Sequence, residues 1–424
     1  MNHPFRQHRR ILVASLVGTA VEFYDFYIYA TAAALVFGPL FFPASSPAAQ
    51  LMLSFLSFGL AFIARPFGAV LFGHFGDRIG RKSTLVASLM LMGVSTLLIA
   101  FLPTYAMAGW LAPLLLCILR FGQGLGLGGE WGGAALLAVE NAPPGWRARF
   151  GMVPQLGAPI GFIAANGLFL LLGMVLTDEE FVAWGWRIPF LASAILVGLG
   201  LWVRLKINET PEFAQALREE APIPIPIGEL LKNHLITTFS GVFAVVACFA
   251  IFYLSTAFAL AYGTTSLGYD REVFLAVQLA AILFLVLGII VAGMRSDSSS
   301  AAKVLTNGCA ATIGLGLIFG PLLGSGSLWL VWIGLSLALF VMGFVYGPLG
   351  EWLPSLFPPR VRYTGASVAF NAGGILGGAL APIAAQALSN YGGTSAVGLF
   401  LTMAGIFSFT GLVLARRPST KSSR

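Results

Sequence analysis

ILVASLVGTAVEFYDFYIYATAAALVF, residues 11–37, is the first apolar segment of this chain and shows the pattern that decides its fold. The segment is long enough to cross the hydrocarbon layer of a membrane, which takes about 20 apolar residues. Two carboxylates, Glu22 and Asp25, interrupt it. An ion at the bilayer centre costs at least about 2.5–3.5 kcal/mol, so such residues usually mark a path for a substrate or for protons.

The composition of the whole chain also indicates a membrane environment. Its 424 residues are 58% hydrophobic and 10% charged, and the mean hydropathy is +0.87. Soluble chains carry roughly 25% charged residues, and so few charges cannot build a water-facing surface. We therefore predict an all-α membrane protein with twelve transmembrane helices, near residues 11–37, 51–73, 84–102, 110–139, 150–176, 186–205, 234–262, 273–294, 304–323, 328–350, 363–388 and 395–415.

The net charge of +7 could indicate nucleic-acid binding, but its distribution indicates a membrane. Basic residues lie on alternate loops, whereas the intervening loops hold almost only Arg271, with Arg187 at the edge of a span. This is the positive-inside pattern. It predicts a multi-pass protein with both termini in the cytoplasm and no nucleic-acid partner. The cytoplasmic set comprises Arg6, Arg9, Arg10, Arg78, Arg81, Lys82, Arg147, Arg149, Arg204, Lys206, Arg218, Lys232, Arg295, Lys303, Arg360, Arg362, Arg416, Arg417, Lys421 and Arg424.

Two six-span halves follow from a central linker and a repeat. The polar stretch 207–233 is charged and then rich in proline, which is typical of a solvated linker with a short amphipathic helix. We predict an N-terminal bundle over 1–206 and a C-terminal bundle over 234–424. Arg147-Ala-Arg149 and Arg360-Val-Arg362 enter equivalent spans of the two halves. Duplicated halves are typical of transporters, which bind their cargo at mid-depth between the halves.

The loop GHFGDRIGRK, residues 73–82, carries a specific pattern of glycine, acid and basic residues. It resembles the loop signature of the major facilitator superfamily. In such a loop Asp77 can bridge to a helix N-terminus or to an arginine, while Arg78 and Arg81 flank it. We expect the loop to act as a gate. The second-half copy has Asp297 followed by three serines and no Gly-Arg pair, which argues against a symmetric latch there.

Further motifs narrow the resemblance to the metabolite:proton symporter family, and they span essentially the whole chain. They are GTAVEFYDFY (18–27), RPFG (65–68), RFGQGLGLGGEWG (120–132), WGWRIPF (184–190), NETPE (208–212) and LFPPRVRY (356–363). The resemblance implies two pseudo-symmetric six-helix bundles that import shikimate, 2-oxoglutarate, citrate, or proline and betaine with protons. The glycines of 122–133 lie inside an apolar span, which favours close helix packing over a phosphate loop.

Three charged residues are the leading candidates for coupling. Glu22 and Asp25 share one helical face near mid-depth, and burial penalises the ionised form of a carboxylate, which lets it take up and release protons. Arg120 cannot deprotonate and must be neutralised by a carboxylate of the protein or of the substrate. The family resemblance places it opposite Asp25, so that protonation of Asp25 would free Arg120 for an anionic substrate. The alternatives are a permanently paired structural carboxylate and a locked Arg120–Asp25 pair.

The other candidates divide by location. Glu130 is either a second protonation site or a packing partner, and Arg65 before Pro66 is either a substrate ligand or the anchor of a helix kink. Glu351 lies at the cytoplasmic end of its span, where we expect it to gate by pairing with Arg360 or Arg362. Polar side chains in the second half would read the shape of the substrate: Tyr253, Ser255, Thr256, Gln278, Tyr346 and Asn371.

We predict a proton-coupled importer of a small organic acid, such as shikimate or a di- or tricarboxylate, in the inner membrane of a bacterium. The alternatives are a symporter of a zwitterionic osmolyte and a proton-driven exporter. We expect a monomer without cofactor or metal. None of the four histidines lies in the interior of a span and the three cysteines have no metal or disulfide spacing, so we do not expect an enzyme.

Overall fold

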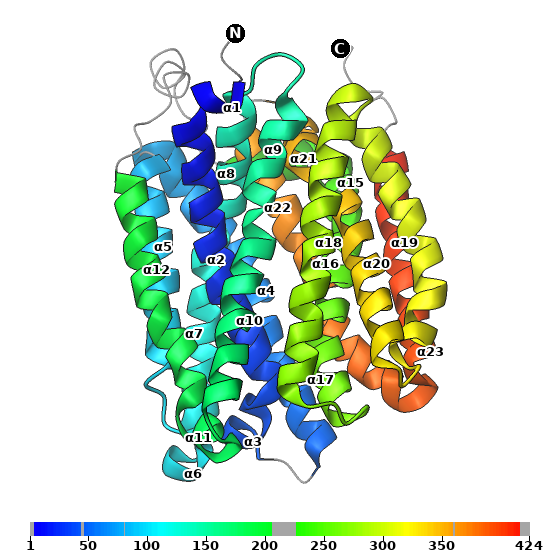
Figure 1. Ribbon diagram of the computed structural model, residues 1–424. Helices are drawn as coiled ribbons and strands as arrows, with labels where there is room; N and C mark the ends of the chain where they lie inside the picture. The colour runs from blue at the N-terminus through cyan, green and yellow to red at the C-terminus, as the bar shows by residue number, and fades with distance from the viewer. Residues whose placement is uncertain (1–3, 44–45, 80, 206–225, 359–360, 416–424) are drawn as a thin grey trace.

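The computed structural model describes residues 4–43, 46–79, 81–205, 226–358 and 361–415, except the side chains of 73–79, 81–85, 203, 204 and 226. Every regular element in these ranges is a helix. The long helices run side by side, and α1 (Pro4–Gln7) and the end of α23 (Leu380–Ala415) lie at the same end of the bundle (Figure 1). We call this end the termini face and the other end the opposite face.

Ten helical stretches of the described chain are long and apolar enough to cross a membrane. The last covers 362–415 and contains two spans, because the backbone turns at Gly393, whose φ of 65° favours glycine. Another span comes from α5 (Arg81–Ile99), in which the stretch Val86–Ile99 is apolar. The twelve-helix architecture is therefore confirmed.

The first half contains six spans, several of them built from two consecutive helices. The termini and the short connecting helices complete it. In chain order the elements are α1, α2 (Arg9–Leu35), α3 (Phe37–Phe41), α4 (Pro47–Ile79), α5, α6 (Tyr105–Ala108), α7 (Leu111–Leu127), α8 (Glu130–Glu140), α9 (Arg147–Gln155), α10 (Gly157–Val175), α11 (Asp178–Ala183), η1 (Gly185–Arg187) and α12 (Ile188–Leu205).

The second half repeats this plan, with a π-helical turn in two of its spans. Its elements are α15 (Leu235–Ala244), α16 (Val246–Tyr253), η2 (Leu254–Phe258), α17 (Ala259–Thr265), α18 (Arg271–Ser298), α19 (Ala301–Leu323), α20 (Leu328–Tyr346), α21 (Leu349–Ser355), α22 (Arg362–Gly374), η4 (Ile375–Ala379) and α23. In the predicted linker, α14 (Pro226–Asn233) precedes α15, and 206–225 lies outside the described residues.

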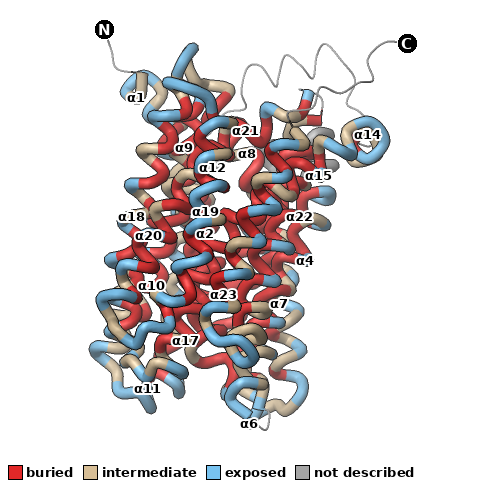
Figure 2. The backbone as a smooth tube through the Cα atoms, turned by 90° about the vertical axis from the view of Figure 1, so that its right-hand side faces the viewer, coloured by how far each residue is buried: buried red, intermediate tan, exposed pale blue. Residues whose placement is uncertain are grey.

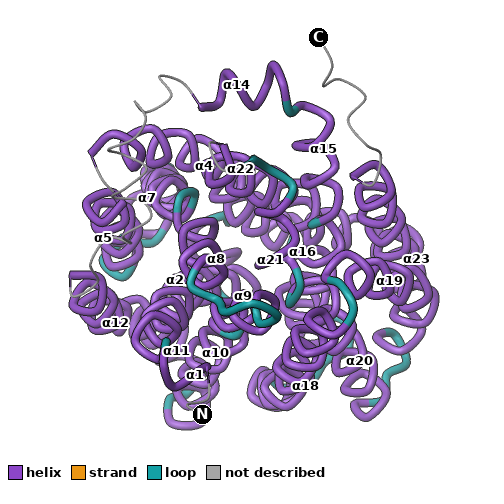
Figure 3. Tube along the Cα trace, turned by 90° about the horizontal axis from the view of Figure 1, so that it is seen from above, coloured by secondary structure: helices purple, strands orange, loops and turns teal. Residues whose placement is uncertain are grey.

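Two seams join the halves. Helices α9 and α10 pack against α18, and α22 packs against α4. Seen from above, the helices of the two halves form two groups that meet along the middle of the bundle (Figure 3). Buried residues fill this middle, whereas exposed residues line the outside and both ends (Figure 2). Large apolar side chains such as Ile195 and Trp329 are among the exposed residues, as a lipid-facing surface requires.

The glycines of α7 allow close packing against α4, as the sequence predicts. A Cβ atom on Gly124 would overlap the backbone of Ala61, and one on Gly128 would overlap the carbonyl of Arg65. This close approach positions the middle of α4 against α7. It thereby brings two of the candidate arginines, Arg65 and Arg120, into the same region of the fold.

Candidate transport site

Five aromatic rings fill the centre of the seam between the halves. Phe26, Phe58 and Phe62 come from the first half, and Phe249 and Tyr253 come from α16 of the second. The centroid of Tyr253 lies 5.2 Å from that of Phe58 and 5.4 Å from that of Phe62, and all five residues are buried. We call this set the central aromatic cluster. A substrate at this depth has to displace rings that now close the space between the halves.

Arg120 lies fully buried beside this cluster. Its Cζ atom is 4.0 Å from the ring centroid of Tyr29 and 4.2 Å from that of Phe26. Nη1 donates to Gln123 Oε1 at 2.9 Å and Nε to the Phe58 carbonyl at 3.4 Å, while Nη2 has no partner. The guanidinium therefore faces aromatic rings and neutral acceptors but no carboxylate.

Asp25 lies on α2 with 1% exposure and receives two hydroxyl groups. Ser193 Oγ donates to Oδ1 at 2.5 Å and Thr96 Oγ1 to Oδ2 at 3.1 Å. A hydroxyl can donate to an ionised carboxylate and accept from a protonated one. The same two partners therefore serve both protonation states of Asp25 without any rearrangement of the backbone.

A chain of hydrogen bonds joins Asp25 to Arg120, although the two residues form no direct ion pair. Gln123 accepts from Arg120 and donates through Nε2 to Thr96 Oγ1 at 2.8 Å. Thr96 has one proton to share between Asp25 and the carbonyl of Met92, which lies 2.9 Å from its hydroxyl. Protonation of Asp25 can thus reverse the Asp25–Thr96 bond. The sequence predicted Arg120 and Asp25 opposite one another, and the structure inserts this two-residue relay between them.

Arg65 on α4 is the second unpaired cation of the site. It is 3% exposed, and neither Nε nor Nη1 has a hydrogen-bond partner. Its Cζ atom lies 4.6 Å from the centroid of Phe26 and 5.1 Å from that of Phe62. Arg65 therefore points into the central aromatic cluster, next to Pro66 in the middle of α4.

Glu22 and Glu130 are also buried. Glu130 begins α8 and accepts a bond of 2.9 Å from Ser88 Oγ. Within the described part of the chain, no ion pair joins either glutamate to Arg65 or Arg120. Their predicted role as additional protonation sites stays a prediction.

The second-half candidates occupy different places. Tyr253 belongs to the central aromatic cluster, and Tyr346 is buried with its hydroxyl unpaired and its carbonyl 3.4 Å from Gln155 Nε2. Asn371 donates across the seam to the Gly128 carbonyl at 2.8 Å. The predicted substrate contacts of Tyr253 and Tyr346 stay predictions, whereas Asn371 joins the two halves.

On the termini face, Asp297 of the second half binds the start of α9 in the first half. Its carboxylate accepts from the backbone N–H groups of Ala148 at 2.9 Å and Arg149 at 3.2 Å, and it pairs with Arg149 Nε at 3.3 Å. A carboxylate at a helix N-terminus complements the helix dipole. The sequence argues against a symmetric latch at this loop, and its gating role stays a prediction. The structure shows that Asp297 joins the two halves here without a Gly-Arg pair.

Further contacts close the termini face below Asp297. Trp131 of α8 stacks on Phe370 of α22, with centroids 3.8 Å apart and ring planes 1° from parallel. The Tyr363 hydroxyl donates to the Gly129 carbonyl. Together with Asn371, these contacts join α8 to α22.

The predicted gating residues are only partly placed. Arg362 donates to the Phe357 carbonyl at 3.3 Å, and it forms no ion pair with the half-buried Glu351 among the described residues. The side chains of Asp77, Arg78 and Arg81 lie outside the described residues, as does Arg360.

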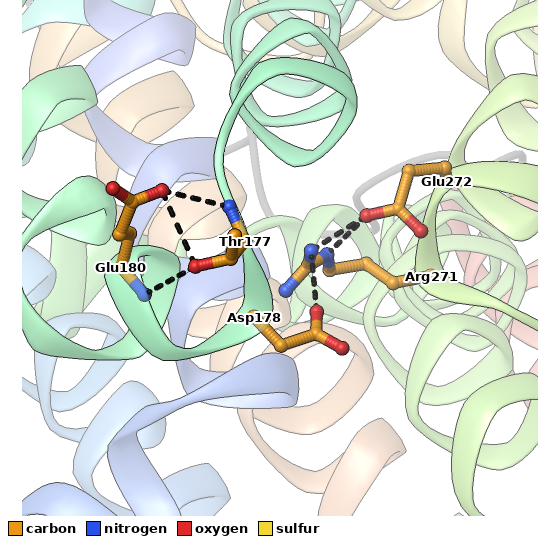
Figure 4. A network of polar contacts seen from close by, with 5 residues as sticks. All are labelled: Thr177, Asp178, Glu180, Arg271 and Glu272. Atoms are coloured by element: carbon orange, nitrogen blue, oxygen red, sulfur yellow. Dashed lines mark hydrogen bonds and ion pairs between the residues drawn. The ribbon is translucent and has the colours of Figure 1, made fainter.

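On the opposite face, Arg271 of α18 crosses to α11. Its Nη2 lies 3.1 Å from Asp178 Oδ1 and 2.6 Å from Glu272 Oε1, and its Cζ atom is 3.8 Å from the ring centroid of Phe181. A capping box, in which Thr177 and Glu180 exchange hydrogen bonds, orders the start of α11 and so presents Asp178 to Arg271 (Figure 4).

A small cavity lies between the halves on the way to this face. Its volume is about 10 Å³, and polar side chains in its wall come from both halves: Tyr27, Thr31, Asn166, Thr256 and Gln278. That is room for about one water molecule and far too little for an organic acid. Arg120, Arg65 and the central aromatic cluster are buried as well, so the described conformation is closed around them.

Sequence reasoning missed the neutral members of the site. Gln123 lies three residues after Arg120, a spacing that places both on one helical face and could have revealed the contact. Thr96 and Ser193 give no such signal, because isolated hydroxyls are common in membrane helices and usually bond their own backbone.

Comparisons with known proteins agree with this architecture. Residues 11–221 match the family model described as sugar (and other) transporter. The chain is 50% identical to the inner membrane metabolite transport protein YhjE of Escherichia coli over 95% of its own length and 93% of that protein's. It is 38% identical to the shikimate transporter of the same organism over 96% of this chain and 94% of the relative. A proline/betaine transporter of Salmonella typhimurium is 28% identical over 89% and 77%.

Solved structures match at the level of the fold. The crystal structure of a D-xylose-proton symporter aligns with a TM-score of 0.71 at 18% identity and covers 97% of this chain and 98% of its own. A major facilitator superfamily proton:xylose symporter bound to 6-bromo-6-deoxy-D-glucose aligns with a TM-score of 0.75 at 16% identity, over 97% of this chain and 95% of its own.

Proposed function

Since this chain belongs to the metabolite transporters of the major facilitator superfamily, we propose that it is a proton-coupled importer of a small organic anion. It is a multi-pass membrane transporter and not an enzyme. We place it in a bacterial inner membrane as a monomer, with both termini in the cytoplasm and two halves that alternate access to a central site. It needs no cofactor in this mechanism.

The observation that carries the proposal is the state of Arg120. A guanidinium stays charged, and a buried charge without a counter-ion costs several kcal/mol. Aromatic faces return about 2 kcal/mol of this when desolvated. Arg120 keeps a free donor, Nη2, and among the described residues it has no acidic partner in the closed conformation. A carboxylate on the cargo would supply both the missing acceptor and the missing charge.

The relay couples this requirement to a proton. While Asp25 is ionised, it balances Arg120 through Thr96 and Gln123, and the empty transporter can pass through the closed conformation. Once Asp25 is protonated, the charge of Arg120 is uncompensated, which raises the free energy of closing. Binding of an anion restores the balance. Neither the proton alone nor the anion alone then crosses efficiently, which is the requirement for symport.

The remaining candidates take supporting roles in this proposal. Arg65, Tyr253, Tyr346 and Asn371 contact the cargo once the halves separate, and Glu22 and Glu130 serve as further protonation sites. Asp77, Arg78, Arg81, Glu351 and Arg362 gate the termini face together with Asp297.

One observation supports a zwitterionic cargo as the second candidate. The rings of Phe58, Phe62 and Tyr253 could face a quaternary nitrogen, and a relative is named as a proline/betaine transporter. However, arginines already lie over Phe58 and Phe62. We therefore rank an anion first.

Proton-driven uptake by purified protein in liposomes tests the proposal. Shikimate, 2-oxoglutarate, citrate and betaine are offered in parallel under an inward proton gradient, and an internal pH dye reports proton entry. We expect at least one acid to carry protons inward. Asp25→Asn should abolish gradient-driven uptake but leave exchange of bound acid, and Arg120→Lys should weaken binding about tenfold because planar bidentate geometry is lost.

Asp270→Asn, which changes an exposed acid at the start of α18, is the matched control and should transport normally. Proton entry that occurs with betaine but with none of the three acids would favour the zwitterionic cargo. Release of an acid from the liposomes while protons enter would identify an exporter. Gradient-driven uptake that survives Asp25→Asn unchanged would remove Asp25 from coupling.

A further inference from the structure

Two buried guanidinium groups share a single aromatic ring at the centre of the fold. The Cζ atoms of Arg65 and Arg120 lie 4.6 Å and 4.2 Å from the ring centroid of Phe26. Since each Cζ is within 4.6 Å of the same point, the two are at most about 9 Å apart. The two helices that carry them, α4 and α7, also pack closely at glycines, which keeps the backbones of the two arginines in the same region of the fold.

Both arginines have unused hydrogen-bonding capacity. Arg65 leaves Nε and Nη1 unpaired and Arg120 leaves Nη2 unpaired, although both side chains are almost completely buried. An arginine that serves as a structural anchor normally has its donors satisfied by carbonyls or carboxylates, because an unmade bond at a buried donor is costly. Three unpaired donor nitrogens on two neighbouring cations instead indicate acceptors that the described residues do not provide.

The ion pairs of the described residues do not supply these acceptors. Asp25 is bound by Ser193 and Thr96. The ion pairs among the described side chains lie at the two faces, where Arg149 meets Asp297 and Arg271 meets acids of α11 and α18. Within the described part of the chain, no carboxylate pairs with Arg65 or Arg120.

We propose that the cargo is an organic dianion whose two acid groups are bound by Arg65 and Arg120 at the same time. This rests on the proposed function and narrows its substrate class. A monoanion can neutralise only one of the two guanidinium groups when the site closes, whereas two acid groups on one short molecule neutralise both. Tyr253 and Phe249, the second-half members of the central aromatic cluster, contact Phe62 of the first half. They would move away with the second half and admit the molecule.

Matched pairs of acids and their half-amides test this directly. Succinate and succinamate, and glutarate and glutaramate, have the same length within each pair and differ in one negative charge. They are offered to wild-type protein in liposomes under an inward proton gradient, and proton entry and apparent affinity are measured. We expect each diacid to bind at least tenfold more tightly than its half-amide.

Arg65→Gln should remove this preference, so that diacid and half-amide become equal, while Arg65→Lys should retain part of it. Removal of an unpaired buried charge does not require new packing, so Arg65→Gln should fold; its thermal unfolding in detergent is measured to verify this. Arg295→Gln, which removes an exposed cation at the termini face, is the control and should keep the preference.

The outcomes separate the two proposals. If diacid and half-amide serve the wild-type protein equally well, or if Arg65→Gln slows both alike, the dianion is refuted while the anion importer stands. If no acid of either kind brings protons inward, both proposals fail.

Discussion

The two faces of the molecule are closed in physically different ways. On the termini face, the contacts between the halves are buried: Trp131 stacks on Phe370, Asn371 binds a backbone carbonyl, and Asp297 holds the first amides of α9. On the opposite face, Arg271 reaches Asp178, whose side chain is 91% exposed.

This difference indicates at which face the two halves separate first. Buried stacking and hydrogen bonds to backbone groups are each worth more than an exposed ion pair, which contributes about 0–1 kcal/mol. The described conformation should therefore open more readily at the opposite face. In the proposed orientation that face points out of the cytoplasm, and the closed state lies close to one that accepts cargo from outside.

Loss of the aromatic stack is the change with the largest expected effect on this asymmetry. Trp131→Ala removes a buried indole from the seam and should cost the closed termini face about 3 kcal/mol, or roughly a hundredfold in its opening equilibrium. Hydrogen exchange of the amides in α8 and α22 measures this opening. Trp329→Ala removes a 74% exposed tryptophan away from the seam and should leave these amides unchanged. Unchanged exchange in Trp131→Ala would contradict a termini face held by this stack.

The Asp297 latch comes second. Asp297→Asn keeps the shape of the side chain but loses its charge, so the interactions with the N-terminus of α9 and with Arg149 weaken by about 1–2 kcal/mol. We expect roughly tenfold faster exchange at the first amides of α9. Asp270→Asn at the other end of α18 should not change it. If both variants behave alike, Asp297 has no latching role and the termini face depends on packing alone.

These effects also show how far the sequence reaches. Twelve spans and a charged centre could be predicted because hydrocarbon penalises every ion and every unpaired backbone group. The spans are therefore long apolar segments, and the few charged residues inside them can be recognised in the sequence. The relay through Thr96 and Gln123 could not, because which hydroxyl meets Asp25 depends on how neighbouring helices rotate and pack. The contact of Asp297 with α9 could not be predicted for a related reason. The sequence identifies Asp297 in the second-half loop, but what it binds depends on the position of α9, which no local motif encodes.

The opposite face should show the smallest effect. In Asp178→Asn the guanidinium of Arg271 keeps Glu272 and the ring of Phe181, so the loss is at most about 0.5 kcal/mol, a factor of about two in opening. Salt sharpens the contrast, because at 1 M the Debye length falls to about 3 Å and screens exposed charges. Exchange at the start of α18 should therefore rise with salt, while exchange in α22 beside the Trp131–Phe370 stack should not. If salt opens both faces equally, or if Asp178→Asn opens its face as strongly as Trp131→Ala opens the other, the two faces are alike and the order of opening proposed for them is wrong.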